Sequence, residues 1–211
     1  MPIYDSKKHI RDIEDLFDTI LGDRNLVTDD ELRVSNNKLV RHAPTWTVLG
    51  DYEASVEEAS HDFTFTAVDF DDDSKLVLIV DISAVLVLSL RMQINDDTSS
   101  NYFTDGRLIA GGVETLIDLN GKASFQILST DILSAVNIGG FAEITIGLNK
   151  AGTSDRPIFI SKGGSGSGPK SEDVSGTLNK AIANISSIKV TTSTSNWQIG
   201  TRMTLYKVSR T

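Results

Sequence analysis

The stretch KLVLIVDISAVLVLSLRMQIN, residues 75–95, decides the fold class of this 211-residue chain. Residues 75–82 form a continuous apolar run, which is typical of a β-strand that is covered on both faces. In residues 84–95 the even positions stay apolar up to Ile94, while the odd positions change from valine to polar residues. Because side chains alternate across a strand, one face of this second strand is expected to stay buried while the other emerges into solvent.

Shorter strand patterns continue on both sides of this stretch. They fall at residues 45–49, 61–70, 107–110, 123–128, 141–149, 157–161, 187–192 and 202–208. Turn-forming residues separate them at 71–74, 95–97, 120–121 and 149–152. Many short strands divided by turns indicate an antiparallel sandwich rather than alternating strands and helices. We therefore predict an all-β protein with a jelly-roll-like β-sandwich.

The glycine-rich stretch GGSGSGPK, residues 163–170, is predicted to be a flexible surface loop between two strands. It is superficially similar to a phosphate-binding loop. Pro169 stands directly after the last glycine, where such a loop requires lysine, and proline lacks a backbone donor. Nucleotide binding is therefore not expected.

The beginning of the chain has a different hydrophobic period. Apolar residues recur every three or four positions in residues 5–21, which predicts an N-terminal amphipathic α-helix. Ile10, Ile13, Phe17 and Ile20 fit the a and d positions of a short heptad run, so they are candidates for oligomerisation or anchoring. Packing of this helix on its own domain is the alternative.

The change of period near Lys38 suggests a division of the chain into two parts. Residues 1–37 contain the helix and a polar linker, and we expect them to anchor the protein or to mediate oligomerisation. Residues 38–211 contain all the predicted strands and are expected to form the sandwich body.

Composition restricts the partners. The formal net charge of −9 disfavours binding to nucleic acid or to an anionic membrane surface. The absence of cysteine excludes disulfides, thiol catalysis and cysteine-ligated zinc. No apolar segment of a signal peptide follows residues 1–9, and the apolar run at 76–90 contains Asp81 and is too short to span a bilayer. We expect no membrane insertion.

Three aspartates near the turn at 71–74 are the candidate metal ligands. Asp69, Asp71 and Asp73 have the spacing that opens a calcium loop. Ser74 stands where an EF-hand loop has glycine, and Val80 stands where it has its closing acid, so an EF-hand is excluded. A looser calcium site and a solvated acidic turn remain as alternatives, and no other cofactor is expected.

No residue pattern indicates catalysis. His9, His42 and His61 are scattered, and no serine lies in a strand-to-helix nucleophile turn. Many carboxylates are present, but no pair stands out for glycoside chemistry. The chain is therefore not expected to be an enzyme.

Aromatic residues are candidates for glycan contacts. Trp46, Trp197 and Tyr102 carry rings that can stack on a sugar. Packing in the core or between subunits is the alternative use of such rings.

Two segments carry motifs of packing and turn residues. The first contains Trp46, Leu49 and Gly50, then Phe63 and Phe65, then the apolar run 76–82, then Leu90, Arg91, Asn95 and Asp97, and finally Asn101 and Tyr102. The second spans residues 185–208 and contains Asn196, Trp197, Gly200, Thr201, Leu205 and Tyr206. These segments resemble small virion structural proteins of tailed bacteriophages, of the tail or head fibre, spike or decoration type. Lys207 departs from the pattern, because the family usually has glycine there.

The resemblance implies a jelly-roll-like, non-catalytic structural protein of the virion. Such a subunit would be made in the host cytoplasm, exposed on the particle, and assembled as a homotrimer that contacts other virion proteins. A virion adhesin would combine this role with binding to a host surface glycan. Arg91 is expected to pair with Asp96 or Asp97 rather than with a ligand. The alternatives are a carbohydrate-binding module or receptor-binding adhesin, and a jelly-roll capsid shell protein.

Overall fold

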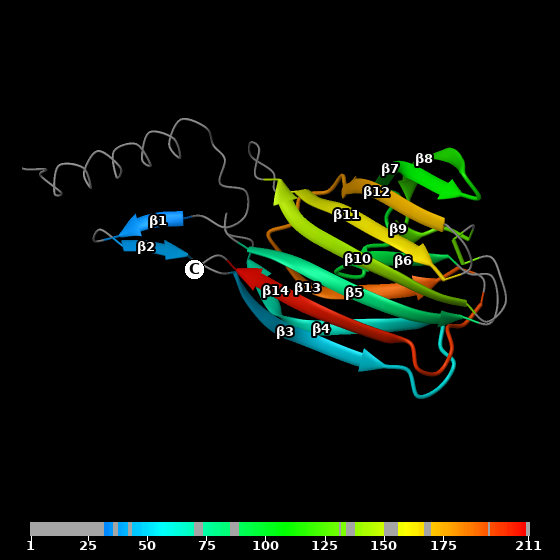
Figure 1. Ribbon diagram of the computed structural model, residues 1–211, viewed down its shortest axis with the longest axis horizontal. Helices are drawn as coiled ribbons and strands as arrows, with labels where there is room; N and C mark the ends of the chain where they lie inside the picture. The colour runs from blue at the N-terminus through cyan, green and yellow to red at the C-terminus, as the bar shows by residue number, and fades with distance from the viewer. Residues whose placement is uncertain are drawn as a thin grey trace, which may run out of the picture. The chain divides into compact units, whose positions relative to one another are not determined.

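The computed structural model describes residues 32–35, 38–41, 44–69, 74–84, 89–130, 132–133, 138–149, 156–166, 170–193 and 195–209. Every regular element in these ranges is a β-strand, and paired strands run antiparallel (Figure 1). The predicted all-β class and antiparallel pairing are therefore confirmed. The amphipathic helix predicted in residues 5–21 lies outside the described residues.

The chain divides into two compact units, Met1–Pro44 with Arg210–Thr211, and Thr45–Ser209. In the first unit, β1 (Leu32–Ser35) and β2 (Lys38–Arg41) form an antiparallel hairpin. The sequence analysis assigned the residues of β1 to a polar linker. The change of period near Lys38 thus falls within this hairpin, and the sandwich unit begins at Thr45.

The second unit contains two sheets. The larger sheet has the order β3-β14-β5-β10-β11-β12-β7-β8, and the smaller has the order β4-β13-β6-β9. The larger sheet consists of β3 (Thr45–Glu53), β5 (Ser74–Ala84), β7 (Tyr102–Ala110), β8 (Val113–Lys122), β10 (Ile138–Asn149), β11 (Arg156–Ser165), β12 (Lys170–Leu178) and β14 (Arg202–Ser209). The smaller consists of β4 (Ser60–Asp69), β6 (Leu90–Ile94), β9 (Phe125–Leu128) and β13 (Asn184–Thr192). The sheets form a two-layer, sandwich-like arrangement (Figure 1).

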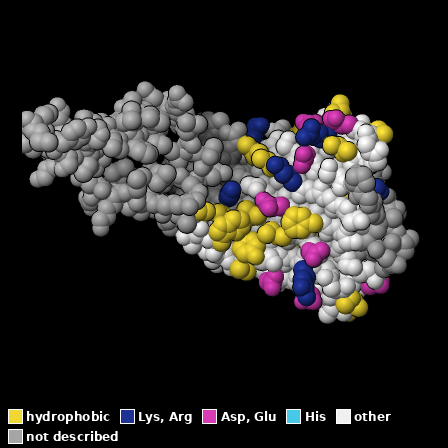
Figure 2. All heavy atoms as spheres, viewed as in Figure 1, with side chains coloured by type: hydrophobic (Ala, Val, Ile, Leu, Met, Phe, Trp, Pro, Cys, Tyr) yellow, Lys and Arg dark blue, Asp and Glu magenta, His cyan; other side chains and the backbone are white. Residues whose placement is uncertain are grey.

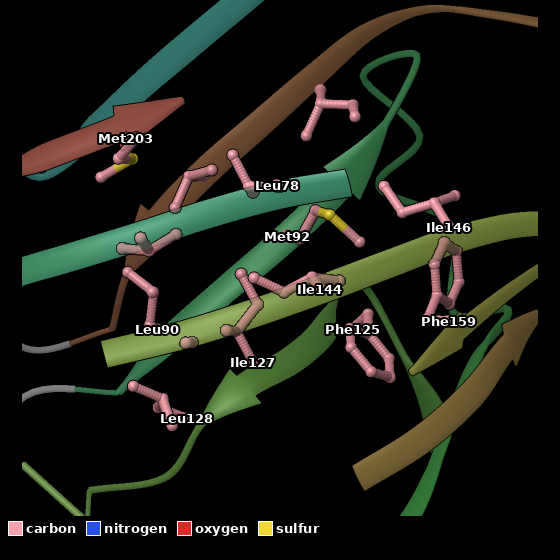
Figure 3. Close-up of a cluster of buried hydrophobic side chains, with 14 of the residues drawn as sticks. Leu78, Leu90, Met92, Phe125, Ile127, Leu128, Ile144, Ile146, Phe159 and Met203 are labelled. Carbon is pink, nitrogen blue, oxygen red and sulfur yellow. The ribbon is translucent and has the colours of Figure 1, made fainter. Parts of the chain in front are cut away.

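The core lies between the two sheets. Alternate residues of β5 point inward and are buried, as the period of a strand requires; they are Leu76, Leu78, Val80 and Ile82. Figure 3 shows side chains of the larger sheet, such as Ile144 and Phe159, packed with Met92 of β6 and Phe125 of β9. Val77, on the other face of β5, is also buried, so the apolar run is covered on both faces at this position.

Four strand pairs are nested along the chain. Strand β3 pairs with β14, β4 with β13, β5 with β10, and β6 with β9. One long antiparallel hairpin folded over into two layers produces this pattern. The hairpins β7–β8 and β11–β12 lie outside the nest, pair with each other through β7 and β12, and extend the larger sheet beyond β10.

Strand β8 has no counterpart in the sequence analysis, which placed a turn at Asn120 and Gly121. Both residues lie inside β8, where Gly121 has a φ of 62° and the register against β7 shifts, so this turn prediction was wrong. The turn that closes the β7–β8 hairpin consists of Gly111 and Gly112, with φ values of 59° and 81°. A two-residue hairpin turn with positive φ at both positions favours glycine.

The first three residues and the last residue of the loop predicted at residues 163–170 lie in strands. Strand β11 continues through Gly163 to Ser165, and β12 begins at Lys170. A Cβ added at Gly163 would lie 2.5 Å from Leu128 Cδ2 and 2.7 Å from the carbonyl oxygen of Phe141. This glycine therefore allows close approach of neighbouring elements, a role that composition does not distinguish from loop flexibility.

Candidate interaction surface

The outer face of the larger sheet, which points away from the smaller sheet, is partly apolar. Cross-strand register places Val48, Tyr206, Val77, Thr145 and Ile160 in one row across β3, β14, β5, β10 and β11. Along each of the strands β14, β5 and β11, a residue adjacent to this row is buried in the core. The row therefore lies on the outer face.

A β-bulge in the edge strand β3 changes which of its side chains point to the outer face. The register against β14 shifts so that Leu49 has no cross-strand partner, and both Val48 and Asp51 then lie on the outer face. Gly50 faces inward, where an added Cβ would lie 2.6 Å from the ring of Phe63. Leu49 and Gly50, which follow Trp46 in the first motif segment, thus form a bulge packed on the opposite sheet.

Exposed apolar side chains form two clusters on this face, and Phe141 on the intervening strand β10 is 50% exposed on the same face. The β3 cluster consists of Trp46, Val48 and Tyr206, and the rings of Trp46 and Tyr206 meet edge to face with centroids 5.4 Å apart. The β11 cluster consists of Ile158 and Ile160. Trp46 and Val48 are 51% and 56% exposed, and Ile158 and Ile160 are 37% and 47% exposed. Figure 2 shows hydrophobic side chains gathered over β3 and β14 at the lower left of the body.

Charged residues of opposite sign flank the two clusters on their own strands. Asp51 and Glu53 follow the β3 cluster, and Glu53 forms an ion pair with Arg202 at 3.1 Å. Arg156 and Lys162 stand on either side of the β11 cluster. All five side chains are exposed. Glu53 and Arg202 pair with each other, and the exposed carboxylates Glu143 and Asp173 lie beside Lys162 in the register.

Burial separates the three candidate glycan contacts. Trp46 is half exposed, whereas Tyr102 and Trp197 are fully buried and cannot stack on a sugar, which corrects the hypothesis for these two rings. Trp197 instead donates a hydrogen bond from Nε1 to Tyr52 Oη at 3.1 Å. Tyr52 in turn stacks on His61, with ring centroids 3.8 Å apart. These aromatic groups pack the end of the sandwich.

The Tyr52–His61 pair is electrostatically neutral near pH 7. Burial lowers the pKa of His61 below its usual 6.5, although Glu58 and Asp62 oppose this shift. Burial also raises the pKa of Tyr52, and Glu58 adds to the rise while the hydrogen bond from Trp197 opposes it. The neutral state of both rings suits packing.

The Asn-x-Asp motif after β6 forms the turn that crosses between the sheets. Asn95 and Asp96 have positive φ values of 50° and 53°, which these residue types tolerate better than most. The Asn95 side chain accepts hydrogen bonds from the backbone of β13. Asp97 forms an ion pair with Lys180, at 2.8 Å between Oδ2 and Nζ. Among the described residues, no ion pair joins Arg91 to either aspartate, so Lys180 replaces it as the partner.

The hydrogen bonds to Asp97 together lower its pKa more than burial raises it. Burial alone would raise the pKa of Asp97, but hydrogen bonds from Lys180 and Ser99 hold that pKa below its usual value. The ionised carboxylate therefore stabilises the crossing turn.

The closing turn before β14 is also structural. The backbone of Trp197 forms a bridge to Glu58, and Gly200 has a φ of 87°. Thr201 is buried, and its Oγ1 accepts a hydrogen bond from the Ser83 N–H at 3.0 Å and donates one to the Ser83 carbonyl at 3.2 Å. Asn95, Asp97, Trp197, Gly200 and Thr201, which belong to the motifs that carry the bacteriophage resemblance, therefore form turns and core contacts.

Glu172 is the one charged side chain buried in the described core, and the sequence analysis did not single it out. It accepts hydrogen bonds from Gln126 Nε2 at 2.9 Å and from the Ser129 N–H at 2.7 Å. These bonds join β12 to β9 and to the residue that follows β9. The alternation of β12, with Glu172, Val174 and Leu178 inward, is the signal that identifies this position.

Several predicted site residues lie outside the description. Ile10, Ile13, Phe17 and Ile20 do so, as do Asp71, Asp73 and the side chain of Asp69. Within the described ranges, no group of three or more histidine, aspartate or glutamate side chains is placed to hold a metal ion. In the same ranges no helix is long and apolar enough to cross a membrane.

Comparison with protein-family models, with curated proteins and with solved structures gives no match to this chain.

Replacing Tyr102 by phenylalanine is expected to lower the free energy of unfolding by about 1–3 kcal/mol. The Ile94 N–H donates to Tyr102 Oη at 2.8 Å and would lose its buried acceptor. Burial raises the pKa of Tyr102 from 10.0 to about 12, although the hydrogen bond from Ile94 opposes the rise. Because burial disfavours the phenolate, the wild-type protein should keep its stability below pH 10 and lose part of it as the pH rises through about 12.

Denaturant titrations between pH 7 and pH 12 measure both effects of the Tyr102→Phe change. The variant should show a smaller alkaline loss of stability than the wild type. Equal stability at pH 7, or an equal alkaline loss, would contradict the assigned role.

Proposed function

We propose that this protein is a non-catalytic structural subunit of a tailed virus particle, exposed as a fibre, spike, decoration or tail subunit and assembled as a homo-oligomer. The observation that carries the proposal is the exposed apolar face of the sandwich, while the motif residues of its two turns are engaged in turn and core contacts. A subunit that works through its assembled shape needs a rigid body and a contact face. An enzyme needs accessible catalytic groups that are placed to act together. The resemblance to virion structural proteins does not imply such groups.

We infer a jelly-roll topology for the sandwich from the nested strand pairs. Folding one long antiparallel hairpin into eight strands pairs the first with the eighth, the second with the seventh, and so on, and it gives the two Greek keys of a jelly roll. The pairs β3–β14, β4–β13, β5–β10 and β6–β9 follow this scheme, with the other two hairpins as insertions. Jelly rolls occur in viral capsid and lectin domains, so the topology supports a virion role.

Residues 1–37 are assigned to anchoring or trimerisation within this proposal. The support is the heptad spacing of Ile10, Ile13, Phe17 and Ile20 in the sequence. The body then provides the exposed part of the subunit.

A carbohydrate-binding module or receptor-binding adhesin is the second candidate function. The half-exposed ring of Trp46 beside Tyr206 favours it, because exposed aromatic rings stack on sugars. The burial of Tyr102 and Trp197 favours the structural role instead, since it removes two of the three expected platforms.

The absolute mass of the purified full-length protein in solution tests the proposal. A stable species with three times the mass of one chain is expected, as measured by light scattering or native mass spectrometry. A monomer at micromolar concentration would contradict assembly. Glycan screening of the wild type and of a Trp46→Ala variant would then test the binding module, which requires binding that the variant loses.

A further inference from the structure

Strand β8 contains the one Asn-Gly pair in the sequence, Asn120 and Gly121. In such a pair the backbone nitrogen of the glycine can attack the side-chain carbon Cγ of the asparagine, and ring closure displaces the amide as ammonia. Glycine exposes this nitrogen more than any other residue does, because it has no Cβ. The pair is therefore a chemical candidate for deamidation wherever water and backbone freedom are available.

The structure leaves this pair outside the regular ladder of β7 and β8. The register shifts between Leu119 and Lys122, so the pair opposes a single residue of β7, as in a β-bulge. Gly121 has a φ of 62°, and both residues of the pair are exposed. Strand β8 is also the edge of the larger sheet, with β7 as its neighbour (Figure 1). Exposed backbone at an edge opens locally at little cost in free energy.

The surroundings of the pair leave room for ring closure. A Cβ added at Gly121 would meet only the Ser100 carbonyl oxygen, at 3.5 Å, so the space around this backbone is open. Asn120 Nδ2 donates a hydrogen bond to Asp118 Oδ1 at 2.6 Å, and both side chains are exposed. Because both groups can bond to water instead, breaking this hydrogen bond costs little.

The one Asp-Gly pair in the sequence, Asp105 and Gly106 in β7, has the opposite environment. Aspartate before glycine closes the same ring with loss of water. Both residues lie in regular ladders, with β8 on one side and β12 on the other. A Cβ added at Gly106 would stand 2.3 Å from the Asp173 carbonyl oxygen, so the neighbouring backbone is closely packed. Ring closure at Asp105 would require β7 to separate from its neighbours.

We propose that Asn120 is a site of spontaneous deamidation in the folded protein. A bond forms between Gly121 N and Asn120 Cγ, the bond between Cγ and Nδ2 breaks, and the Gly121 amide proton leaves with the amide as ammonia. Water then opens the ring at either carbonyl, which yields aspartate or isoaspartate. The product replaces the hydrogen bond to Asp118 by a contact of two carboxylates and adds one negative charge to the net charge of −9. The outer edge of β8 thus changes with the age of the protein.

Peptide mapping of the aged full-length protein tests the proposal. Cleavage after Arg107 and Lys122 releases residues 108–122, in which Asn120 is the one asparagine. During incubation at neutral to alkaline pH this peptide should gain the mass difference between an amide and an acid, and it should separate into aspartate and isoaspartate forms. Conversion in the folded protein should be within about tenfold of the rate in a synthetic peptide of the same sequence, because an exposed bulge opens at little cost. The rate should rise with pH, since the attacking nitrogen must lose its proton.

Two internal controls accompany the measurement. The Asn120→Gln variant keeps an exposed amide but would have to close a larger and less favourable ring, so its peptide 108–122 should stay unchanged. Asp105 should form isoaspartate only after the protein is unfolded in denaturant, because the ladders of β7 hold it in the native state. Circular dichroism verifies that the variant folds like the wild type.

Three results would overturn the proposal. In the first, residues 108–122 stay unchanged in the folded protein while the synthetic peptide converts. In the second, the Asn120→Gln variant still forms isoaspartate in this peptide, which would move the reaction to Asp118. In the third, Asn179 and Asn184, which are not followed by glycine, convert as fast as Asn120. None of these results bears on self-assembly, which the mass in solution tests separately.

Discussion

Replacing Trp197 by alanine is expected to lower the free energy of unfolding by about 3–5 kcal/mol. The Trp197 side chain is fully buried, and its ring lies edge to face with Tyr52 at 6.1 Å between centroids. The change removes this packing, leaves a cavity, and deprives Tyr52 Oη of the hydrogen bond from Nε1. Equilibrium denaturation with guanidinium at pH 7 measures the loss.

Trp46→Ala is the matched control for Trp197→Ala. The same residue type is half exposed on the edge strand β3, so its removal should cost the single chain less than about 1 kcal/mol. Equal losses of unfolding free energy in the two variants would contradict the role of Trp197 as a core residue. If Trp46→Ala weakens the oligomer while the stability of the monomer is unchanged, the β3 cluster takes part in self-assembly.

Replacing Gly176 by alanine is expected to destabilise the fold by about 3 kcal/mol, at the upper end of the range for overpacking. Gly176 lies in β12, and an added Cβ would stand 2.0 Å from the Phe103 carbonyl oxygen and 2.9 Å from Phe125 Cε2. The first neighbour is backbone of β7, so the β7–β12 pair must shift to make room. Thermal and denaturant unfolding measure the cost.

Gly147→Ala is the control for Gly176→Ala. Gly147 lies in β10, and an added Cβ there meets nothing within 4 Å. Alanine should therefore be neutral, or should stabilise the protein by about 0.4–1 kcal/mol through the unfolded chain. Similar losses in both variants would indicate that strand glycines matter here for backbone conformation and not for close approach.

Strands with a strong apolar period could be predicted from the sequence. The run of β5 and the alternation of β10 and β14 identify strands, because burial imposes period two on the chain wherever one face meets a core. The turn at Asn95 and Asp96 was also identifiable, since these residue types accept positive φ.

Strands β8 and β12 could not be predicted in the same way. Strand β8 is an edge strand with exposed residues along most of its length, so no buried face imposes a pattern. Strand β12 carries Glu172 and Gly176 at inward positions, and both residue types count against a strand until their partners are known. Strand pairing supplies those partners from distant parts of the chain.

The candidate surface was predictable only in part. Trp46, Trp197 and Tyr102 are equivalent as aromatic residues in the sequence, and only tertiary packing places the first outside and the other two inside. The bulge at Leu49 changes which residues of β3 face outward, so simple alternation fails along that strand.

The sequence by itself determined the all-β class, the inward and outward period of the strong strands, and the chemistry of the turn at Asn95 and Asp96, because these are local properties of neighbouring residues. Tertiary structure alone decided the nested pairing of strands, the use of Trp197 and Tyr102 as core residues, and the separation of the β3 and β11 clusters on one face. The physical reason is that burial of a side chain depends on which distant segment covers it, and that segment is chosen by the pairing of the whole chain.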